Sequence, residues 1–559
     1  MQLNELAHLK GEAVDYQKLV FDYQACDDQH APQPVRRPVA IVGAGPVGLS
    51  LAIDLAQRGV PVVVLDNDNT LSTGSRAICF AKRTLEIFDR LGCGDRMAAK
   101  GVSWNVGKVF FRDEQVYSFD LLPESGHARP AFVNLQQYYV EGFLAQRCAQ
   151  LPLIDVRWNN AVSGVEPHDD HVVLTIDTPD GPYRLAADHV AACDGSRSAV
   201  RRLMGLESKG RTFRDRFLIA DVRMKHEAPA ERWFWFDPEF HPNQSVLLHR
   251  QPDGVWRIDF QLGWDADPEE ERKPEKILPR VRALLAHSAM EDCDFELEWA
   301  SVYTFSCLRM ERFRHGRVLF AGDAAHGVSP FGARGANSGV QDADNLGWKL
   351  AAVLQHGAPD ALLDTYARER EFAADENIRN STRSTDFITP KSDVSRLFRD
   401  AVLELAKTQP FARSLVNSGR LSTPSTLHGS TLNTPDADAF AGAMVPGAPA
   451  ADAPVTTRDG RASWLLHELG DGFTVLVAGT HAGDLGRIDG HGLDVKALSV
   501  AHQGADLDDA SGLLAARYDL RPGTVYLLRP DQHVCARWRS ADADAIGAAI
   551  RRALAISLG

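Results

Sequence analysis

Two glycine-rich stretches, far apart in the chain, each place a carboxylate beside a flexible turn. GDAAHGVSPFGARGAN (322–337) surrounds Asp323 with small residues, and GAGPVG (43–48) precedes Asp66. The second stretch has the GxGxxG spacing, which lets backbone amides and a helix N-terminus approach a pyrophosphate. An acid after the next strand can accept both hydroxyls of an adenosine ribose, so we predict a bound dinucleotide with an unphosphorylated ribose. The residues expected to bind its adenosine half are Gly43, Gly45, Pro46, Val47, Gly48, Asp66 and Asn67.

The elements that must position these residues can be read from hydrophobic spacing. Residues 38–68 read as a buried strand, a glycine turn, an amphipathic helix and a second apolar strand, which is a βαβ unit. RVLFAGDAAH (317–326) repeats the change from apolar strand to glycine, and apolar residues recur at helical spacing from Val340 to Leu354. A glycine turn that only allows close helix packing is the alternative. FAD is a longer molecule than NAD and suits two distant loops, so FAD is the favoured dinucleotide.

Composition limits the class of protein. A chain of 559 residues exceeds one hydrophobic core, so two or three structural units are expected. Hydrophobic residues make up 44%, and no apolar run approaches a bilayer span of roughly 18 to 20 residues, so no membrane partner is expected. The formal charge of −14 argues against nucleic acid. The 8 cysteines lack the spacing of a zinc or dithiol site, so no metal is expected, and without an apolar leader segment a cytoplasmic location follows.

The pattern of elements divides the chain into five parts, one of which is formed by two separate segments. Strand-like runs such as ERWFWF and SVLLHRQ make one segment β-rich, and a proline-rich stretch separates the last unit. We predict an N-terminal extension at 1–37, a nucleotide-binding domain formed by 38–210 and 311–420, an inserted β-rich substrate domain at 211–310, a linker at 421–454, and a small α/β domain at 455–559.

With three more segments, the chain resembles the FAD-dependent aromatic hydroxylases, the single-component flavoprotein monooxygenases of the 3-(3-hydroxyphenyl)propionate hydroxylase and phenol hydroxylase branch. GSRAICF contains Arg76, NLQQYYVEGFL contains Gln137, and ACDGSRSAVRR contains Asp194 and Gly195. Read alone, Asp194 is most often a helix-capping carboxylate. The resemblance covers about residues 38–390. It implies an α/β fold, with a glutathione-reductase-type Rossmann FAD-binding domain, an inserted β-sheet substrate domain and a C-terminal thioredoxin-like domain.

The resemblance also implies roles for individual residues. Arg76 would approach the FAD phosphates, Gln137 would contact the flavin, and Asp323 would bind the ribitol chain. The following loop would lie along the isoalloxazine ring, and the next helix would direct its N-terminus at the flavin. The chain departs from the family at Arg334, where a glutamine is common, and at Asn67, where a basic residue is common. The flavin-side residues implied are Asp194, Gly195, Gly322, Asp323, Pro330, Gly332, Ala333, Arg334, Gly335, Ala336 and Asn337.

The substrate-side residues are sought in the β-rich segment. In VWRIDFQL (255–262), polar and apolar residues alternate, so one face is core and the polar face points either to solvent or into a pocket. His249 and Tyr303 are candidates for a hydrogen bond that activates a phenol, because histidine titrates near neutral pH and tyrosine can relay a proton. Gln261 on the polar face is the third candidate catalytic residue.

The function predicted from the resemblance is hydroxylation of a phenolic compound. NADPH or NADH would reduce FAD, dioxygen would give a flavin C4a-hydroperoxide, and its terminal oxygen would attack the aromatic ring. RWFWFDP lacks the Ile-Pro of the halogenase motif WxWxIP. An epoxidase, a Baeyer-Villiger-type enzyme, or a flavin-binding regulator without turnover remain alternatives. The last domain contains Cys535 but no CxxC, so a structural role or formation of a homodimer is expected of it.

Overall fold

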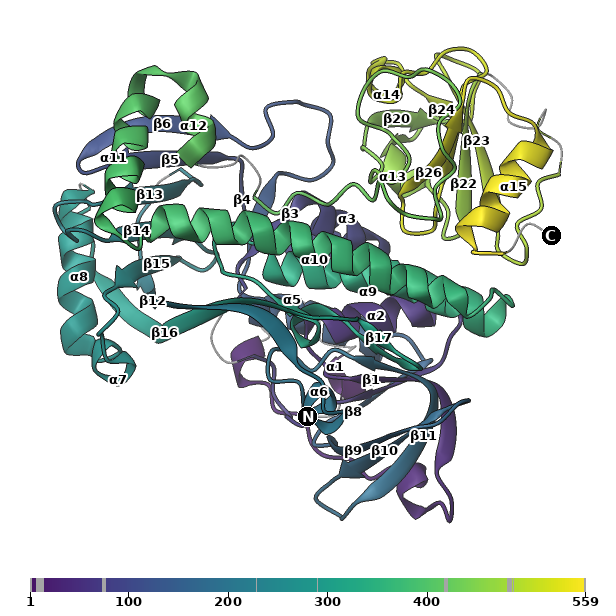
Figure 1. Ribbon diagram of the computed structural model, residues 1–559, viewed down its shortest axis with the longest axis horizontal. Coiled ribbons are helices and arrows are strands. Elements are labelled where there is room, and N and C mark those ends of the chain that lie inside the picture. The colour runs from purple at the N-terminus through teal and green to yellow at the C-terminus, as the bar shows by residue number, and fades with distance from the viewer. Residues whose placement is uncertain are drawn as a thin grey trace.

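The computed structural model folds the chain into three regions joined by two long helices (Figure 1). A first sheet and its helices contain the N-terminal motifs, a second sheet lies at the far end of the molecule, and the C-terminal region forms a separate sheet. This is the α/β organisation with an inserted sheet that the sequence predicts. The structure describes residues 3–6, 15–72, 77–227, 229–288, 290–416, 421–479, 485 and 487–556.

The first sheet has a parallel core with the strand order β18-β11-β1-β2-β8. Its strands are nearly continuous apolar runs, as parallel strands covered on both faces are, and VVVL of β2 is buried at every position. Helix α2 crosses over from β1 to β2 and packs against α5 and α9. The bounds are β1 Val35–Val42, α2 Pro46–Gln57, β2 Val62–Leu65, β8 Ile154–Arg157, β9 Ala161–Pro167, β10 Val172–Asp177, β11 Tyr183–Ala192, β17 Arg314–His315 and β18 Val318–Phe320.

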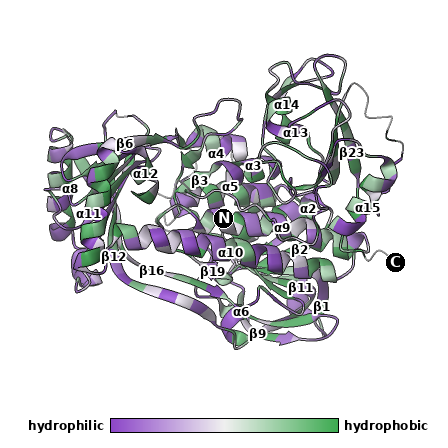
Figure 2. Cartoon of the chain, turned by 45° about the horizontal axis from the view of Figure 1, so that its top comes forward, coloured by the Kyte–Doolittle hydropathy of each residue, from purple (hydrophilic) through white to green (hydrophobic). Residues whose placement is uncertain are grey.

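Two long helices run across the middle of the molecule and connect its parts (Figure 1). Helix α9 (Gly335–Gln355) packs against α2, and α10 (Ala361–Ile388) lies along α9. Hydrophobic and hydrophilic residues alternate along both helices (Figure 2), as amphipathic packing requires. The side chain of Trp348 is fully buried between α9 and the C-terminal sheet. The helices therefore hold the loop at the start of α9 in a fixed position relative to both sheets.

The second sheet has the order β19-β16-β12-β15-β14-β13-β5-β6 and is larger than the sequence predicts. Residues 106–120, expected to lie in the nucleotide-binding domain, add the edge strands β5 and β6, because β13 pairs in parallel with β5. Segment 211–310 therefore does not form this sheet alone. The bounds are β5 Val106–Phe111, β6 Glu114–Asp120, β12 Ser208–Met224, β13 Arg232–Phe236, β14 Ser245–Arg250, β15 Val255–Leu262, β16 Phe295–Met310 and β19 His326–Gly327.

The alternation predicted for residues 255–262 is present in β15. Trp256, Ile258 and Phe260 pack in the core beneath α8 (Pro274–His287). On the opposite face Arg257 and Gln261 are also buried, so this polar face turns into the molecule and not toward solvent. Arg257 is neutralised there by a two-bond ion pair with Asp221.

The C-terminal region is a mixed sheet with the order β21-β20-β24-β23-β22-β25-β26. Strands β22 and β23 are parallel, and β25 and β26 follow as an antiparallel pair. The described residues 421–453 before it contain no helix or extended strand. The bounds are β20 Pro454–Thr457, β21 Ala462–Trp464, α13 Leu465–Glu468, β22 Phe473–Ala478, β23 Val495–Ala501, β24 Leu507–Asp508, α14 Leu513–Tyr518, β25 Val525–Leu528, β26 Val534–Trp538 and α15 Ala543–Ala553.

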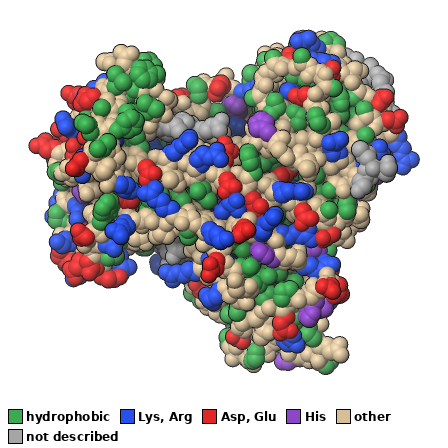
Figure 3. All heavy atoms as spheres, viewed as in Figure 1, with side chains coloured by type: hydrophobic (Ala, Val, Ile, Leu, Met, Phe, Trp, Pro, Cys, Tyr) green, Lys and Arg blue, Asp and Glu red, His purple; other side chains and the backbone are tan. Residues whose placement is uncertain are grey.

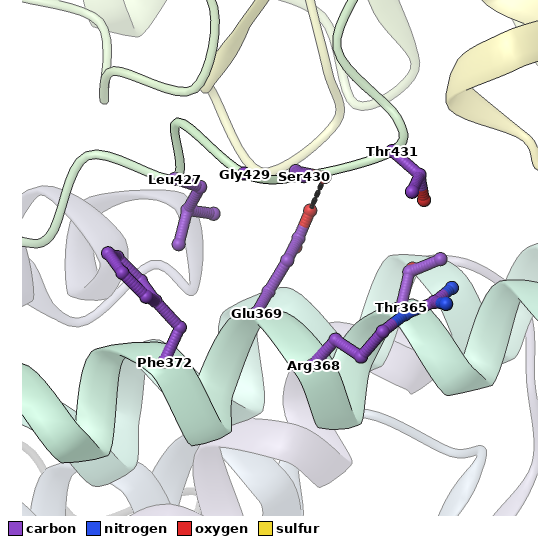
Figure 4. A pocket seen from close by; sticks show the side chains of 8 residues that line it. All are labelled: Thr365, Arg368, Glu369, Phe372, Leu427, Gly429, Ser430 and Thr431. Carbon is purple, nitrogen blue, oxygen red and sulfur yellow. Dashed lines mark hydrogen bonds between the residues drawn. The ribbon is translucent and has the colours of Figure 1, made fainter.

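A buried charge cluster joins the C-terminal region to α10. The carboxylate of Glu369 accepts hydrogen bonds from Arg529 at 2.7 Å and from Lys349 at 2.7 Å. Ser430 of the linker donates a further hydrogen bond to Glu369, at the base of a small pocket between α10 and the linker (Figure 4). Burial by itself would raise the pKa of Glu369, but Arg529 and Lys349 outweigh it and hold that pKa well below its usual range. Separating the C-terminal region from α10 would break this buried charge cluster, which is energetically costly.

Replacing Ser430 by alanine is expected to lower the free energy of unfolding by about 1 kcal/mol, because a buried carboxylate loses one donor. Thr431 is the matched control, since its exposed side chain is adjacent and makes no hydrogen bond to Glu369. Thr431→Ala should change stability by less than about 0.5 kcal/mol. Urea unfolding followed by tryptophan fluorescence measures both. Equal stability of the two variants would contradict this role of Ser430.

The remaining elements complete the layers around the first two sheets. A three-stranded sheet of β3, β7 and β4 lies between them. Among the described residues, no helix is long and apolar enough to cross a membrane. The bounds are α1 Leu3–Leu6, β3 Cys79–Ala81, α3 Lys82–Arg90, α4 Gly94–Lys100, β4 Val102–Trp104, β7 Phe132–Asn134, α5 Gln137–Ala149, α6 Ala199–Leu203, α7 Pro268–Glu271, α11 Asp393–Thr408 and α12 Pro410–Val416, with short 3-10 turns at Tyr16–Lys18, Asp27–His30 and Gly322–Ala324.

Candidate active site

Four loops that follow parallel strands meet at one edge of the first sheet. Gly43 follows β1, Asp66 follows β2, Asp194 follows β11 and Asp323 follows β18. Because these strands are parallel neighbours, their carboxyl ends form a single edge, which is where open α/β sheets bind ligands. Strands β2 and β18 are three strand spacings apart, and three steps of about 4.8 Å give about 14 Å. The two carboxylates remote in the sequence thus lie on one edge, separated by the length of an extended ligand.

The glycines of the first loop are required by close backbone approaches. Gly43 has φ +105°, and a Cβ at Gly48 would lie 1.9 Å from the carbonyl oxygen of Gly43. A Cβ at Gly45 would meet nothing within 4 Å, so the space in front of the loop is open. Pro46 is the first residue of α2, whose free N–H groups face this space. Val47 contacts Gly322, and so joins this loop to the loop after β18.

Asp66 is held by backbone donors. One carboxylate oxygen accepts the N–H of Ala44 at 2.5 Å, and the other accepts the N–H of Asp68 at 2.8 Å. Burial raises the pKa of Asp66 above its usual value. The neighbouring Asn67 is exposed. These bonds orient the carboxylate beside the glycine loop, where a ribose can be reached.

Only one of the two carboxylate oxygens of Asp194 accepts a hydrogen bond from the described residues. Its Oδ2 accepts the N–H of Val200 at 3.0 Å, which is the helix-capping role that the residue type alone suggests. Its Oδ1 is buried and has no hydrogen-bond partner among the described residues. Gly195 follows with φ +75°, and a Cβ there would meet nothing within 4 Å. A buried acceptor without a donor is costly, and its position at the open edge fits a ligand that supplies a donor, such as a hydroxyl of FAD.

The loop that contains Asp323 is held from below by a buried network. Asp342 of α9 accepts the N–H of Gly322 at 2.9 Å, His326 Nε2 donates to it at 2.6 Å, and Arg370 of α10 donates to it at 2.6 Å. Asp342 and His326 are completely buried. Asp323 itself is exposed at the edge and lies beside the first residues of α9. Asp342 lies on a helix that hydrophobic spacing predicts, but no sequence motif distinguishes this residue.

The interactions of Asp342 predict how the free energy of unfolding depends on pH. Burial by itself would raise the pKa of Asp342, but His326 and Arg370 outweigh it and lower that pKa. A lowered pKa in the folded state gives stability that is present above the unfolded pKa of about 3.9 and is lost as pH falls through the folded pKa. Asp342→Asn should therefore reduce the free energy of unfolding by about 1.5 kcal/mol at pH 7.

Unfolding of wild type and Asp342→Asn at several pH values measures that difference. It should be constant from pH 7 down to about 4 and shrink below, where the wild-type carboxylate becomes protonated. A difference that grew as the pH fell would contradict the role assigned to Asp342.

The loop 330–337 combines a sharp turn with the start of α9. Gly332 has φ +107° and Ala333 has φ +52°, a left-handed conformation that costs a residue with a Cβ about 1 kcal/mol. Pro330 is exposed, and Gly335 and Ala336 are half-buried at the first turn of α9. Arg334, the residue that departs from the family, is buried and donates to Asn377 of α10 at 3.1 Å.

The side chain of Asn337 has a structural function. Its Oδ1 accepts the N–H of Ala81 at 2.8 Å, and its Nδ2 donates to the carbonyls of Cys79 at 2.8 Å and Ala333 at 2.6 Å. These bonds connect α9 to β3 and fix the turn before α9. Only the backbone of Asn337 is left to face a ligand.

The two other predicted cofactor residues lie at the start of α5 and before β3. Gln137 accepts the N–H of Ala77 at 3.0 Å and donates to Glu141 at 2.8 Å and to Ser72 at 3.0 Å. Gln137 thus shapes the loop that leads to β3. Arg76 lies outside the described residues.

The three candidate catalytic residues do not form one constellation. His249 is buried with its Nε2 3.6 Å from Asp259, and burial together with Arg232 lowers its pKa to about 4, so it is neutral at pH 7. Gln261 accepts the N–H of Ser245 at 2.9 Å. Tyr303 lies on β16, two strands from Gln261, and is 37% exposed. The titration near neutral pH that made His249 a candidate is absent.

A cavity that is partly open to solvent lies between the second sheet and the loop 330–337. Arg232 supplies the only charged group among the described residues that line it, and the walls are aromatic and aliphatic. The lining residues are Val109, Phe119, Arg232, Phe234, Phe236, Phe331, Gly332, Ser384, Ile388, Val416 and Leu421.

Arg232 is the residue in this cavity that sequence reasoning missed. It is 8% exposed, and within the described part of the chain its guanidinium makes no hydrogen bond and no ion pair. Burial lowers the pKa of Arg232, although a guanidinium stays charged in proteins. Asp259 acts electrostatically on this cation without forming a direct ion pair with it. A buried cation that is not directly paired is unfavourable, so the cavity is suited to an anionic ligand. The signal in the sequence was an arginine at the start of the aromatic strand RWFWF.

Comparison with known protein families matches residues 36–381 to the family described as FAD binding domain. Among curated proteins, a 3-(3-hydroxy-phenyl)propionate/3-hydroxycinnamic acid hydroxylase of Mycobacterium sp. (strain KMS) is 30% identical over 531 residues, which are 88% of this chain and 87% of that protein. A probable NADH-specific resorcinol 4-hydroxylase of Rhodococcus jostii (strain RHA1) is 34% identical over 340 residues, which are 60% of this chain and 62% of that protein.

Among solved structures, the flavin-dependent monooxygenase PieE, crystallised with FAD and substrate, superimposes with a TM-score of 0.78. The alignment covers 94% of this chain and 100% of that chain, at 22% sequence identity. This likeness shows the fold.

Proposed function

The chain belongs to the family of FAD-dependent aromatic hydroxylases, and from this premise we propose that it hydroxylates a phenolic ring bound as its phenolate beside Arg232. The observation that supports the proposal is a buried, unpaired guanidinium in an aromatic-walled cavity that also contacts Gly332 of the flavin loop. Aromatic side chains suit a planar ring. The single cation selects an anionic oxygen on that ring.

We place FAD along the carboxyl edge of the first sheet. Asp66 would accept the adenosine ribose hydroxyls, and the loop Gly43–Gly48 with the N-terminus of α2 would bind the pyrophosphate. Asp194 and Asp323 would face the ribitol end, and the backbone of Gly332–Asn337 would lie along the isoalloxazine ring. The open space at Gly45 and the unpaired oxygen of Asp194 fit this placement. Bound FAD supplies the activation of dioxygen, which no side chain of the protein can perform.

The protein's own contribution to the reaction is electrostatic and steric. Arg232 would lower the pKa of a bound phenol, because an adjacent cation favours the anion. The phenolate is more electron-rich than the phenol and so reacts more readily with an electrophilic oxygen. Phe234, Phe236 and Phe331 would exclude water around the ring. This geometry favours Arg232 over His249, Gln261 and Tyr303 as the group that faces the substrate.

Two further features of the proposal concern the reductant and the last domain. NADH or NADPH would reduce the flavin, and the relative with an NADH-specific name supports a nicotinamide donor.

The C-terminal sheet has the order β23-β22-β25-β26 with α15 packed on it, which supports a thioredoxin-like domain. Its Cys535 is buried, so the domain would serve structure and not thiol exchange.

The experiment that tests the function is product analysis with purified protein. Hydroxyphenyl acids, resorcinols and simple phenols are supplied with NADH or NADPH and air, and products are identified by mass spectrometry. We expect one phenol to gain a single oxygen atom in step with nicotinamide oxidation. Turnover of alkenes or ketones alone would point to an epoxidase or a Baeyer-Villiger-type enzyme. Hydrogen peroxide as the only product with every phenol would contradict the proposal.

A further inference from the structure

Helices α11 and α12 carry the largest group of exposed apolar side chains on the described part of the molecule. Phe398 on α11 and Phe411 on α12 are 57% and 63% exposed. Figure 3 shows hydrophobic side chains gathered at the corner of the molecule where Figure 1 places α11 and α12. The other strongly exposed apolar residues, such as Trp264 and Phe372, are scattered singly. We call this group the α11–α12 face; its members are Val394 (78% exposed), Leu397 (72%), Phe398, Leu405 (41%), Phe411 and Leu415 (49%).

The spacing of these residues shows that α11 is apolar on two sides. Val394, Phe398 and Leu405 recur at helical intervals and form an outer stripe. Leu403 and Ala406 form an inner stripe that packs against the second sheet. A surface helix normally has one apolar stripe, and a helix that is apolar on both sides is buried on both. Among the described residues of one copy, nothing covers the outer stripe.

The exposed area matches what a dimer requires. The six side chains together expose roughly 600 Å² of apolar surface. A single exposed patch of this size is at the upper end for a monomeric protein, for which about 300–600 Å² is typical. Pairing two copies would bury roughly 1,200 Å², which reaches the range of stable protein–protein interfaces.

The charges around the face favour a second copy of the chain over a lipid surface. Asp393 and Arg396 are both exposed at the start of α11. Two-fold pairing can bring the negative group of one copy toward the positive group of the other. The formal charge of −14 opposes binding to an anionic membrane. We propose that the α11–α12 face is the two-fold interface of a homodimer, in which each copy covers the outer stripe of the other.

The proposed interface lies next to the cavity that contains Arg232. Val416 of α12 lines the cavity from the inner side, while Leu415 beside it belongs to the outer face. The dimer contact would therefore lie directly behind one wall of the cavity. The proposal does not depend on the proposed function, because it rests on the exposure, spacing, area and charges of the α11–α12 face.

The test is the oligomeric state of the full-length protein with FAD bound. Sedimentation velocity from 0.1 to 50 μM should show a species of twice the chain mass for wild type. Leu397→Glu with Phe398→Glu should weaken dimerisation at least 100-fold while the flavin absorbance stays unchanged, which shows that the variant is folded. Phe372→Glu is the matched control, because it replaces an exposed phenylalanine on α10 by the same charged residue, and it should leave the dimer intact.

Three results would overturn the proposal. Wild type could sediment as a single chain at 50 μM. This result would overturn the proposal also if the single chain were found to bind neutral lipid vesicles. The dimer could survive the double substitution with affinity within threefold of wild type. Phe372→Glu could dissociate the dimer as strongly as the double variant.

Discussion

Replacing Arg232 by methionine should lower kcat/KM for the phenolic substrate by about 30-fold to several thousand-fold, the equivalent of about 2–5 kcal/mol for removing one partner of a desolvated charge pair. The reason is that the buried guanidinium is the charged group among the described residues of the cavity. Methionine keeps the length and apolar stem of the side chain, so the cavity walls should remain. Flavin absorbance and thermal stability should change little, because the wild-type side chain makes no hydrogen bond or ion pair within the described part of the chain.

A spectroscopic measurement separates this electrostatic role from a packing role. A phenol whose anion absorbs at longer wavelength is titrated while bound to wild type and to Arg232→Met. In wild type its pKa should fall below the solution value, and in the variant it should return to that value or above it. Arg232→Lys, which retains the charge, should recover part of the shift. An unchanged pKa of the bound phenol in Arg232→Met would show that the guanidinium does not face the substrate.

Replacing Asp323 by alanine should weaken FAD binding by about 10- to 150-fold, since a hydrogen bond to a charged group is worth about 1.5–3 kcal/mol. The side chain is exposed at the end of β18, so the substitution should not unfold the chain. Equilibrium dialysis of the apoprotein with FAD measures the change. Asp188→Ala is a control, because it removes a half-buried carboxylate within the neighbouring strand β11 that pairs with Arg36, and it should not affect FAD binding.

Fragments of the cofactor locate the effect within the molecule. Asp323→Ala should weaken binding of FMN and leave ADP binding as in wild type, whereas Asp66→Ala should weaken ADP and leave FMN unaffected. The two carboxylates lie at positions about 14 Å apart on the sheet edge, so each should sense one end of FAD. If both variants lost the same fragment, the two residues would not bind opposite ends of one cofactor.

The placement of Asp66 and Asp323 at one edge could be predicted from sequence because both follow strongly apolar strands that end in glycine turns. Parallel strands bring such turns together whatever the distance along the chain. The alternation in residues 255–262 was equally readable, but the sequence could not show which way the polar face points. That direction depends on the partner of the face, and the answer comes from the buried pair of Arg257 with Asp221.

Other features depend on contacts that no local pattern reports. Strand β5 joins the second sheet through parallel pairing with β13, more than a hundred residues away. Asp342 reaches the loop of Asp323 only because α9 folds back beneath β18. Arg232 resembles any basic residue at the start of a strand until the folded chain leaves it buried and unpaired. Long-range pairing and burial decided these three cases, and a single sequence contains neither.

The central claim is that one FAD molecule spans the sheet edge from Asp66 to Asp323 with its ring beside the Arg232 cavity. A crystal structure of the protein with FAD bound tests it most directly. We expect adenosine ribose oxygens within hydrogen-bond distance of the Asp66 carboxylate, about 2.6–3.2 Å, and ribitol oxygens within the same distance of Asp323 in the same molecule. An FAD bound with either carboxylate out of reach, or with its ring turned away from Arg232, would contradict the claim.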